Sequence, residues 1–215
     1  SFNDLFLFDE QFSATDKGNV LLITDRDGKT VNDTIPIIAE GTNYGQDKIQ
    51  VYGEYALFLP TMSDIIYKIG PTGHVSAAYS FDFGRYWLDS KESSEVSANS
   101  GSDSSTLWRY LQRNNKISFL RFLDTQEWLF LSFKKQDISY NWYYNKNSKS
   151  QYIIDLKDAA GNLLESCNIV GVDEGRFIAA VPAYSYSQLE NVPPLEISEE
   201  DNLVLVSFGI EEEKQ

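Results

Sequence analysis

The chain has 215 residues, of which 42% are apolar and 14% aromatic, enough for one sizeable globular core. Its 32 acidic residues against 18 lysines and arginines give a formal charge of −14, which argues against nucleic acid or an anionic membrane surface as a partner because phosphates would be repelled. The chain has a single cysteine, Cys167, so it cannot form an internal disulfide. Its single histidine, His74, leaves few residues that could build a zinc site or a Ser-His-Asp triad. We therefore expect no metal and no cofactor.

Short β-rich runs bounded by Gly, Pro, Asn or Asp fill the first 84 residues, which is the pattern of an antiparallel meander. The predicted strands are 4–8, 19–23, 30–38, 49–60, 64–70 and 75–84. In the last strand, alternation places Phe81 and Phe83 on one face, toward the core, and Asp82 on the other. His74 falls in the turn before that strand, where we expect it to be exposed.

The segment 24–31, TDRDGKTV, can be read as a calcium loop or as a turn. An EF-hand loop needs oxygen ligands at alternate positions and a glutamate six residues after its glycine. Here only Asp25 and Asp27 precede Gly28, and Thr34 stands six residues after it. The ligands are too few for calcium. Asp-Gly between two β-rich runs therefore predicts a hairpin turn, in which the glycine supplies a positive φ.

The strand pattern stops over 89–115. The first part of this segment has almost no apolar residue, so it cannot bury enough surface to offset its ordering and is predicted to be a flexible loop. Leu107, Tyr110 and Leu111 then recur at helical spacing, with Ser104 or the serine after it as a candidate N-cap. The sequence predicts one short helix here.

Strands resume in the second half of the chain. They are predicted in 116–135 around the turn 124–127, in 138–156 around the turn 145–148, and in 163–172, 175–183 and 202–210. Cys167 lies inside one of these runs and is expected to be a buried thiol.

The hairpin turns recur along the chain. Gly28 and Gly73 stand 45 residues apart, and Ser148, in a third hairpin, stands 75 residues after Gly73. Without the segment 89–115, the second spacing is also close to the first. A recurrence of roughly 40–50 residues, with about four strands in each unit, is typical of β-propeller blades, while a sandwich or a barrel stays open as an alternative.

Five motifs carry a family resemblance when they are taken in order along the chain. They are SDIIYKIGPTGHVSAAYSFDFGRYWL (63–88), STLWRYLQRNN (105–115), YYNKNSKSQYIIDL (143–156), LKDAAGNLL (156–164) and EEDNLVLV (199–206). In this order they resemble the six-bladed β-propeller proteins of Bacteroides and its relatives, mostly predicted lipoproteins of unassigned function. Leu203 departs from the pattern, because the family often has proline there.

The resemblance implies an all-β fold of three to four antiparallel propeller-type blades, because a chain of 215 residues holds only part of a six-bladed ring. We expect a single domain over 1–215, with its loop and short helix in 89–115. The expected blades are 1–38, 39–84, 116–158 and 163–210. A partial propeller leaves blade edges open, which predicts self-association or a partner chain that covers them.

The resemblance also implies a place outside the cytoplasm, in the periplasm or at the cell surface. The expected link to a membrane is a lipid anchor upstream of Ser1 in a precursor.

Propellers bind ligands where loops from several blades converge. The aromatic candidates for such a site are Trp87, Trp108, Tyr86, Trp142 and Tyr144. Exposed rings with neighbouring Asn and Asp suit the faces and hydroxyls of a sugar, while packing between blades is the competing interpretation of each ring.

The sequence therefore favours a non-catalytic binding or scaffolding module for a carbohydrate or a protein partner. The alternative is a carbohydrate-active enzyme, a glycoside hydrolase or lyase, that uses paired carboxylates at the channel mouth, with Asp82 and Asp89 as the nearest candidates. A third hypothesis is a purely structural subunit that completes a ring with another chain.

Overall fold

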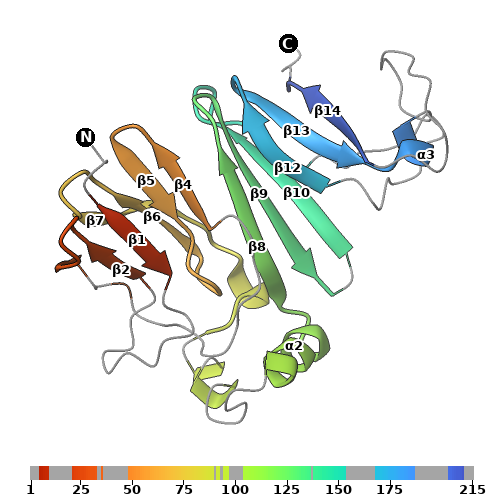
Figure 1. Ribbon diagram of the computed structural model, residues 1–215. Coiled ribbons are helices and arrows are strands. Elements are labelled where there is room, and N and C mark those ends of the chain that lie inside the picture. Colours follow the sequence, from red (N-terminus) through yellow and green to blue (C-terminus); the bar gives the residue numbers. More distant parts are fainter. Residues whose placement is uncertain are drawn as a thin grey trace. The chain divides into compact units, whose positions relative to one another are not determined.

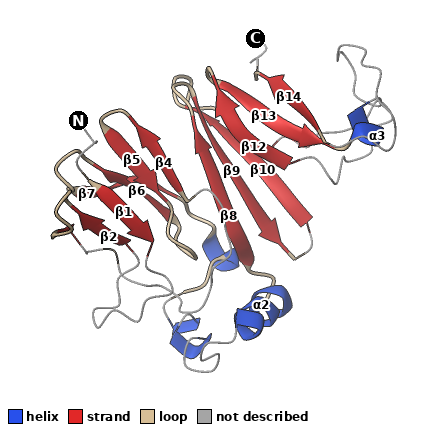
Figure 2. Ribbon diagram, in the orientation of Figure 1, coloured by secondary structure: helices blue, strands red, loops and turns tan. Residues whose placement is uncertain are grey.

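The computed structural model describes residues 5–9, 21–32, 35, 48–89, 91–92, 94–96, 104–136, 138–153, 168–186 and 203–210. They form four antiparallel sheets with a few short helices, which confirms the predicted all-β class (Figure 1, Figure 2). The chain divides into two compact units. One is Ser1–Phe122 with Ser132–Ser139, and the other is Leu123–Leu131 with Tyr140–Gln215.

The first unit contains a three-stranded and a four-stranded sheet. The first sheet is β1 (Phe6–Asp9), β2 (Leu21–Thr24) and β3 (Thr30–Asn32), and the second is β4 (Ile49–Tyr52), β5 (Tyr55–Phe58), β6 (Ile65–Ile69) and β7 (Val75–Ser80). The run 49–60, predicted as one strand, is a hairpin in which Tyr52 pairs with Tyr55. Gly53 and Glu54 form its two-residue turn, the shortest connection that antiparallel strands allow.

The hairpin between β2 and β3 confirms that 24–31 is a turn. The Oδ1 atom of Asp25 accepts hydrogen bonds from the backbone N–H groups of Asp27 (3.0 Å) and Lys29 (2.9 Å). Gly28 donates its N–H to the Asp25 carbonyl at 3.1 Å and has a φ of 78°. The carboxylate that looked like a metal ligand thus stabilises the turn.

The same backbone turn recurs between β6 and β7. The Gly70 N–H donates to the carbonyl of His74 at 2.9 Å, and Gly73 donates to the Gly70 carbonyl at 3.0 Å. Gly73 has a φ of 79° and takes the place that Gly28 has in the first turn. His74 is exposed, as predicted.

The two sheets of this unit share one apolar core. Its buried members are Leu21, Ile23, Ile35, Ala56, Phe58 and Ile69. At the edge of the core, the Asn32 side-chain amide donates a hydrogen bond to the Gly73 carbonyl at 2.9 Å. The turn at Gly73 is therefore held against the neighbouring sheet.

Strand β7 ends at Ser80, so the predicted extension to 84 is wrong. The Asp82 Oδ1 atom accepts a hydrogen bond from the Gly84 N–H at 2.8 Å, and the chain turns into the 3-10 helix η2 (Gly84–Tyr86). The rings of Phe81 and Phe83 lie on one side, 5.9 Å apart, and Asp82 is exposed, but both rings are only half-buried.

The predicted helix is confirmed as α2 (Ser104–Arg113). It ends where Asn115 adopts a φ of 55°, in the left-handed region. The Lys116 N–H then donates to the Leu111 carbonyl (2.9 Å) and the Asn115 N–H to that of Gln112 (3.3 Å), which is a Schellman motif. The side chain of the candidate N-cap lies outside the described residues.

The predicted loop over 89–105 is wrong at residues 91, 92 and 94–96, which are helical. Asp89 and Glu92 form a reciprocal capping box, in which each side chain accepts a hydrogen bond from the backbone N–H of the other at 2.8 and 3.0 Å. Val96 is buried in a cluster with Met62 and the apolar face of α2. One valine and one capping pair are too weak a signal to change a prediction based on composition.

The remaining sheets come from the second half of the chain. One has the order β11-β10-β9-β8 and the other the order β12-β13-β14. Their strands are β8 (Ile117–Asp124), β9 (Trp128–Lys135), β10 (Ile138–Asn145), β11 (Gln151–Ile153), β12 (Asn168–Asp173), β13 (Arg176–Val181) and β14 (Val204–Phe208). A further short helix, α3 (Ala183–Tyr186), was not predicted.

The core of the second unit is rich in aromatic rings. Its buried members are Leu123, Trp128, Phe130, Tyr143, Ile169, Phe177, Ala179, Val181 and Tyr186. The Phe177 ring lies 5.8 Å from that of Phe130 and 5.3 Å from that of Tyr143, so the central strands of two sheets interlock.

The third hairpin turn, between β10 and β11, is one residue longer than the first two. The Asn145 N–H donates to the Ser150 carbonyl at 3.0 Å, and the positive φ of 65° falls on Lys149. The structural counterpart of Gly73 is thus Lys149 and not the predicted Ser148.

An ion pair fixes the neighbouring turn in the same sheet. The Lys146 ammonium lies 2.6 Å from Asp124 Oδ1 and also donates to the Thr125 carbonyl. Only 3% of the Asp124 side chain is exposed. Lys146 therefore ties the β10–β11 turn to the β8–β9 turn.

Several predictions fall on residues that the structure does not describe. These are the Cys167 thiol, most of the run 34–38 and the segment 97–103. Most of the segments 33–47 and 154–167, which join neighbouring sheets, also lies outside the described residues, so the blade limits stay a prediction. Among the residues that are described, no helix has the length and apolar character needed to cross a bilayer.

Candidate functional site

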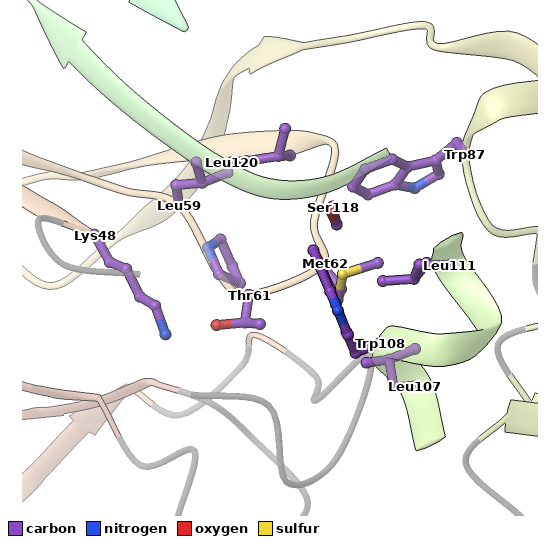
Figure 3. A pocket seen from close by; sticks show the side chains of 11 residues that line it. Lys48, Leu59, Thr61, Met62, Trp87, Leu107, Trp108, Leu111, Ser118 and Leu120 are labelled. Atoms are coloured by element: carbon purple, nitrogen blue, oxygen red, sulfur yellow. The ribbon is translucent and has the colours of Figure 1, made fainter. Parts of the chain in front are cut away.

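Two of the predicted aromatic residues, Trp87 and Trp108, line one open pocket in the first unit. Trp87 directly follows η2, and Trp108 lies on α2. The pocket holds about 500 Å³ of empty space, open solvent included. Its other lining residues are Lys48, Leu59, Pro60, Thr61, Met62, Leu107, Leu111, Ser118 and Leu120, and Figure 3 labels all of these except Pro60.

The amphipathic pattern of α2 explains how Trp108 reaches this pocket. Leu107 and Leu111 lie four residues apart, so they share one face of the helix, and both are buried. Trp108 follows Leu107 directly and remains half-buried at the edge of that face. Its indole therefore lies where the apolar core meets solvent.

The segment between β5 and β6 forms a wall of the pocket, and the sequence did not predict this wall. The Ser63 N–H donates to the Pro60 carbonyl at 3.1 Å, which turns the chain at Thr61 and Met62. Met62 has a φ of 56°, a conformation that costs a residue other than glycine about 1 kcal/mol or more. A strained residue at a pocket wall is a common feature of ligand sites.

The lining of the pocket is mostly apolar. Besides the indole N–H groups of Trp87 and Trp108, its polar groups are those of Lys48, Thr61 and Ser118, and no carboxylate or side-chain amide is among the described residues that line it. Such a site offers large apolar surfaces and a few hydroxyl contacts.

Lys116 holds the backbone of Trp87 in place. Its ammonium lies 2.6 Å from Glu92 Oε2 and donates a hydrogen bond to the Trp87 carbonyl at 2.9 Å. The two charged side chains are 10% and 24% exposed, so the ion pair is partly shielded from water. Lys116 also takes part in the motif that ends α2, and it thereby joins both indole-bearing segments.

Glu92 is the centre of this network. The hydrogen bond from Lys116, followed by the one from the Asp89 backbone, holds the pKa of the Glu92 carboxyl below its usual value. The Tyr110 hydroxyl donates to Glu92 Oε1 at 3.4 Å. Burial, and then the charge of Glu92, raises the pKa of Tyr110. The result is one connected set of contacts behind the pocket.

Tyr86 does not line the pocket, although it precedes Trp87. Its ring contacts two cations, with the Lys135 Nζ atom 4.3 Å and the Arg85 Cζ atom 5.1 Å from the ring centroid. Tyr86 is thus part of a separate surface cluster.

Trp142 and Tyr144 lie in the second unit, on the same face of β10. Their rings are parallel, with centroids 5.9 Å apart, and both are half-buried. The Lys149 Nζ atom lies 5.9 Å from the centroid of the Tyr144 ring. The pair remains a predicted binding feature.

The two carboxylates considered for catalysis have local structural roles. Asp82 stabilises the turn that leads into η2, and Asp89 caps the helical residues 91, 92 and 94–96. Neither lines the pocket. No group of three or more His, Cys, Asp or Glu side chains that could hold a metal ion occurs in the described part of the chain.

Sequence reasoning missed Met62, Lys116 and Glu92. The D-x-x-E spacing at 89–92 is a capping-box signal that could have revealed the helical residues. The pairing of Lys116 with Glu92 has no local signature, because the two residues lie 24 positions apart.

Comparison with known proteins agrees with this fold. The chain is similar to the crystal structure of a Bacteroides fragilis protein named "Putative exported protein", with a TM-score of 0.71 and 18% identity. The alignment covers 97% of this chain and 62% of that one, so this chain spans about three fifths of the other protein's length. At this identity, the likeness establishes the fold alone.

No curated protein matches the sequence. A family model described as "6-bladed beta-propeller" matches residues 2–178, which is most of the chain. This match confirms the resemblance seen in the sequence motifs, and the four antiparallel sheets fit its propeller-type architecture. The chain belongs to the 6-bladed beta-propeller family.

Proposed function

We propose that this chain is part of a non-catalytic binding module that acts outside the cytoplasm and receives apolar side chains of a protein partner in the pocket at Trp87 and Trp108. One observation carries the proposal. Two indoles from different elements line one open pocket whose other walls are mainly leucine, proline and methionine side chains. Tryptophan is enriched among the residues that dominate protein–protein binding energies.

The composition of the pocket favours a protein partner over a carbohydrate. Sugar hydroxyls are usually bound by carboxylate and amide groups that surround an aromatic ring. The lining offers neither group, and its polar groups are the hydroxyls of Thr61 and Ser118, the side chain of Lys48 and the two indole N–H groups. The same composition speaks against the carbohydrate-active enzyme, because a glycosidase needs two carboxyl groups at the bound sugar.

The proposed location is supported by the fold. The structurally similar Bacteroides fragilis protein is named as exported, and we extend that location to this chain as part of the proposal. A lipid anchor upstream of Ser1 would attach the protein to a membrane.

The edge of the sheet β12-β13-β14 supports a further expectation, that another chain covers blade edges. Leu203 and Leu205 are 62% and 68% exposed at β14, which is an edge strand among the described residues. Light scattering on the purified chain tests this expectation, and a monodisperse monomer would contradict it.

A selection experiment tests the proposed pocket. Random twelve-residue peptides displayed on phage are selected on the native chain and then on Trp108→Ala, Trp87→Ala and Trp142→Ala. We expect enriched peptides to carry aromatic or branched apolar residues. Their binding should fall at least tenfold on the first two variants and stay unchanged on Trp142→Ala, which removes an indole from the other unit.

The competing hypotheses predict different results. If the ligand is a carbohydrate, a glycan array gives a signal that Trp87→Ala and Trp108→Ala abolish, while no peptide is enriched. An enzyme would turn over a polysaccharide, and that turnover would be lost after carboxylate-to-amide substitution at Asp82 or Asp89.

A further inference from the structure

Arg85 and Lys135 bring two positive charges to one tyrosine. Arg85 and Tyr86 belong to η2, whereas Lys135 is the last residue of β9, 50 positions later. The Lys135 Nζ atom lies 4.3 Å and the Arg85 Cζ atom 5.1 Å from the centroid of the Tyr86 ring. The guanidinium also donates a hydrogen bond to the Tyr86 hydroxyl at 3.1 Å. The fold thus brings Lys135 to two residues that are neighbours in the chain.

The cluster is unusual in so acidic a chain, which has 32 acidic residues against 18 basic ones. Arg85 makes no ion pair among the described residues. The nearest carboxylate along the chain, Asp82, already accepts the Gly84 N–H hydrogen bond with its Oδ1 atom. The face of an aromatic ring attracts cations, so Tyr86 offsets part of the repulsion between the two positive side chains.

The electrostatic state of Tyr86 agrees with this geometry. The hydrogen bond from Arg85, then its charge and the charge of Lys135, hold the pKa of the Tyr86 hydroxyl below its ordinary value. The two cations therefore favour a negative charge at the phenol oxygen.

An apolar wall lies beside the cations. The Phe83 ring lies 5.3 Å from that of Trp87 and 5.6 Å from that of Phe133, and all three rings are half-buried. Phe133 and Lys135 are two residues apart on β9, so both point to the same face of the sheet. A ligand that meets the cations can thus also contact ring edges.

We propose that Arg85, Tyr86 and Lys135 form a site for a carboxylate of a peptide, with the Phe83 and Phe133 rings beside it for a neighbouring apolar side chain. A single carboxylate can accept hydrogen bonds from the guanidinium and the ammonium together. Both cations lie against the Tyr86 ring, which leaves less of that ring for stacking on a sugar. The net charge of −14 opposes a regularly charged polyanion more strongly than it opposes one carboxylate.

This site is distinct from the pocket, because none of its three residues lines the pocket. It agrees with the proposed protein partner but does not depend on the indole contacts. The Trp108→Ala variant separates the two, since it should remove binding in the pocket and leave the carboxylate site intact.

The test uses NMR on the ¹⁵N-labelled chain. The probes are the capped peptide acetyl-Leu-Glu-Leu-amide and its glutamine counterpart, which lacks the carboxylate. The side-chain Nε–H signal of Arg85 is assigned by its loss in Arg85→Lys. We expect the glutamate peptide to shift this signal saturably and to bind at least about threefold more tightly than the glutamine peptide, as expected for a partly exposed ion pair.

Two lysines that are neighbours on β9 provide a matched control. Lys135→Gln should weaken the glutamate peptide by at least about threefold, while Lys134→Gln, the same charge change on the opposite face of the strand, should leave its affinity unchanged. Thermal melting of each variant shows whether it is folded, and Trp108→Ala should keep the full Arg85 shift.

Four results would overturn the proposal. They are no shift of the Arg85 signal, equal binding of the two peptides, equal loss in Lys134→Gln and Lys135→Gln, and tighter binding of trigalacturonate than of the glutamate peptide. The last result would assign the site to an acidic sugar.

Discussion

Gly73 lies so close to Val31 that a Cβ atom at position 73 would be 2.6 Å from the Val31 Cγ1 atom. The contact joins the β6–β7 turn to β3 of the neighbouring sheet. Gly28 has nearly the same φ, 78° against 79°, but a Cβ atom there would meet nothing within 4 Å. A comparison of the two glycines therefore separates the cost of a positive φ from the cost of a steric contact.

We predict that Gly73→Ala lowers the free energy of unfolding by about 2–4 kcal/mol and Gly28→Ala by only about 1 kcal/mol. Both variants carry the strain of a positive φ, and only the first also pushes against Val31. Urea denaturation measures the two values. Adding Val31→Ala should bring Gly73→Ala close to Gly28→Ala, and equal losses in the two single variants would refute the steric explanation.

Replacement of Asn115, the residue that ends α2, by glycine should stabilise the folded chain. It has a φ of 55°, and its side-chain Oδ1 atom is buried without a hydrogen-bond partner. Asn115→Gly relieves both features and should raise the free energy of unfolding by about 0.5–1 kcal/mol. Asn115→Ala removes only the amide and should be less stable than Asn115→Gly. Thermal melts of the two variants provide the comparison, and the opposite order would contradict the assigned helix end.

The Lys116–Glu92 ion pair should make stability depend on pH in the acid range. The pKa of Glu92 is lowered in the folded chain, so its contribution is complete above the unfolded pKa of about 4.3 and is lost as the pH falls through the lower folded value. At pH 7, Glu92→Gln should cost about 1–2 kcal/mol.

Melting temperatures of the native chain and Glu92→Gln, measured from pH 7 to pH 3, test this pH dependence. The difference between them should be constant down to about pH 5 and shrink below about pH 4. A difference that persists unchanged at pH 3 would show that the charge of Glu92 is not what stabilises the pair.

Breaking the Asp124–Lys146 pair should be more costly, because Asp124 is more deeply buried. Lys146→Met leaves this carboxylate without its ammonium and should lower the free energy of unfolding by about 3 kcal/mol. The double variant Asp124→Asn, Lys146→Met removes both charges and should recover part of that loss. Lys134→Met, the same change at an exposed position of β9, is the control and should change stability by less than about 0.5 kcal/mol. A double variant no more stable than Lys146→Met would argue against a charge effect.

Local sequence signals predicted most of the strands and turns. The Asp-Gly turn at 25–28, the hairpin 117–135 and the helix over 104–113 each depend on residues that are close in the chain, and all three are confirmed. The predicted strand 75–84 failed at its end, because Asp82 stabilises a turn there that alternation alone does not reveal. Capping by side chains is local too, but it is a weaker signal than hydrophobic periodicity.

The candidate site was only partly predictable. Trp87 and Trp108 could be chosen because large rings beside a polar loop are conspicuous, yet nothing in the sequence says that they line the same pocket. The approach of Lys135 to Tyr86 requires β9 to return past η2, which is a result of tertiary structure. Contacts between distant segments follow from strand order, and a single sequence does not encode strand order locally.

The matching turns at Gly28 and Gly73 make two short backbone segments geometrically equivalent. Residues 25–29 and 70–74 have the same hydrogen-bond closure and nearly the same glycine φ. Each segment could therefore accept the other's residues as a graft without a change in strand register. Side chains could then be exchanged between the two hairpin tips while the sheets below them keep their structure. In this way the propeller would serve as a display scaffold.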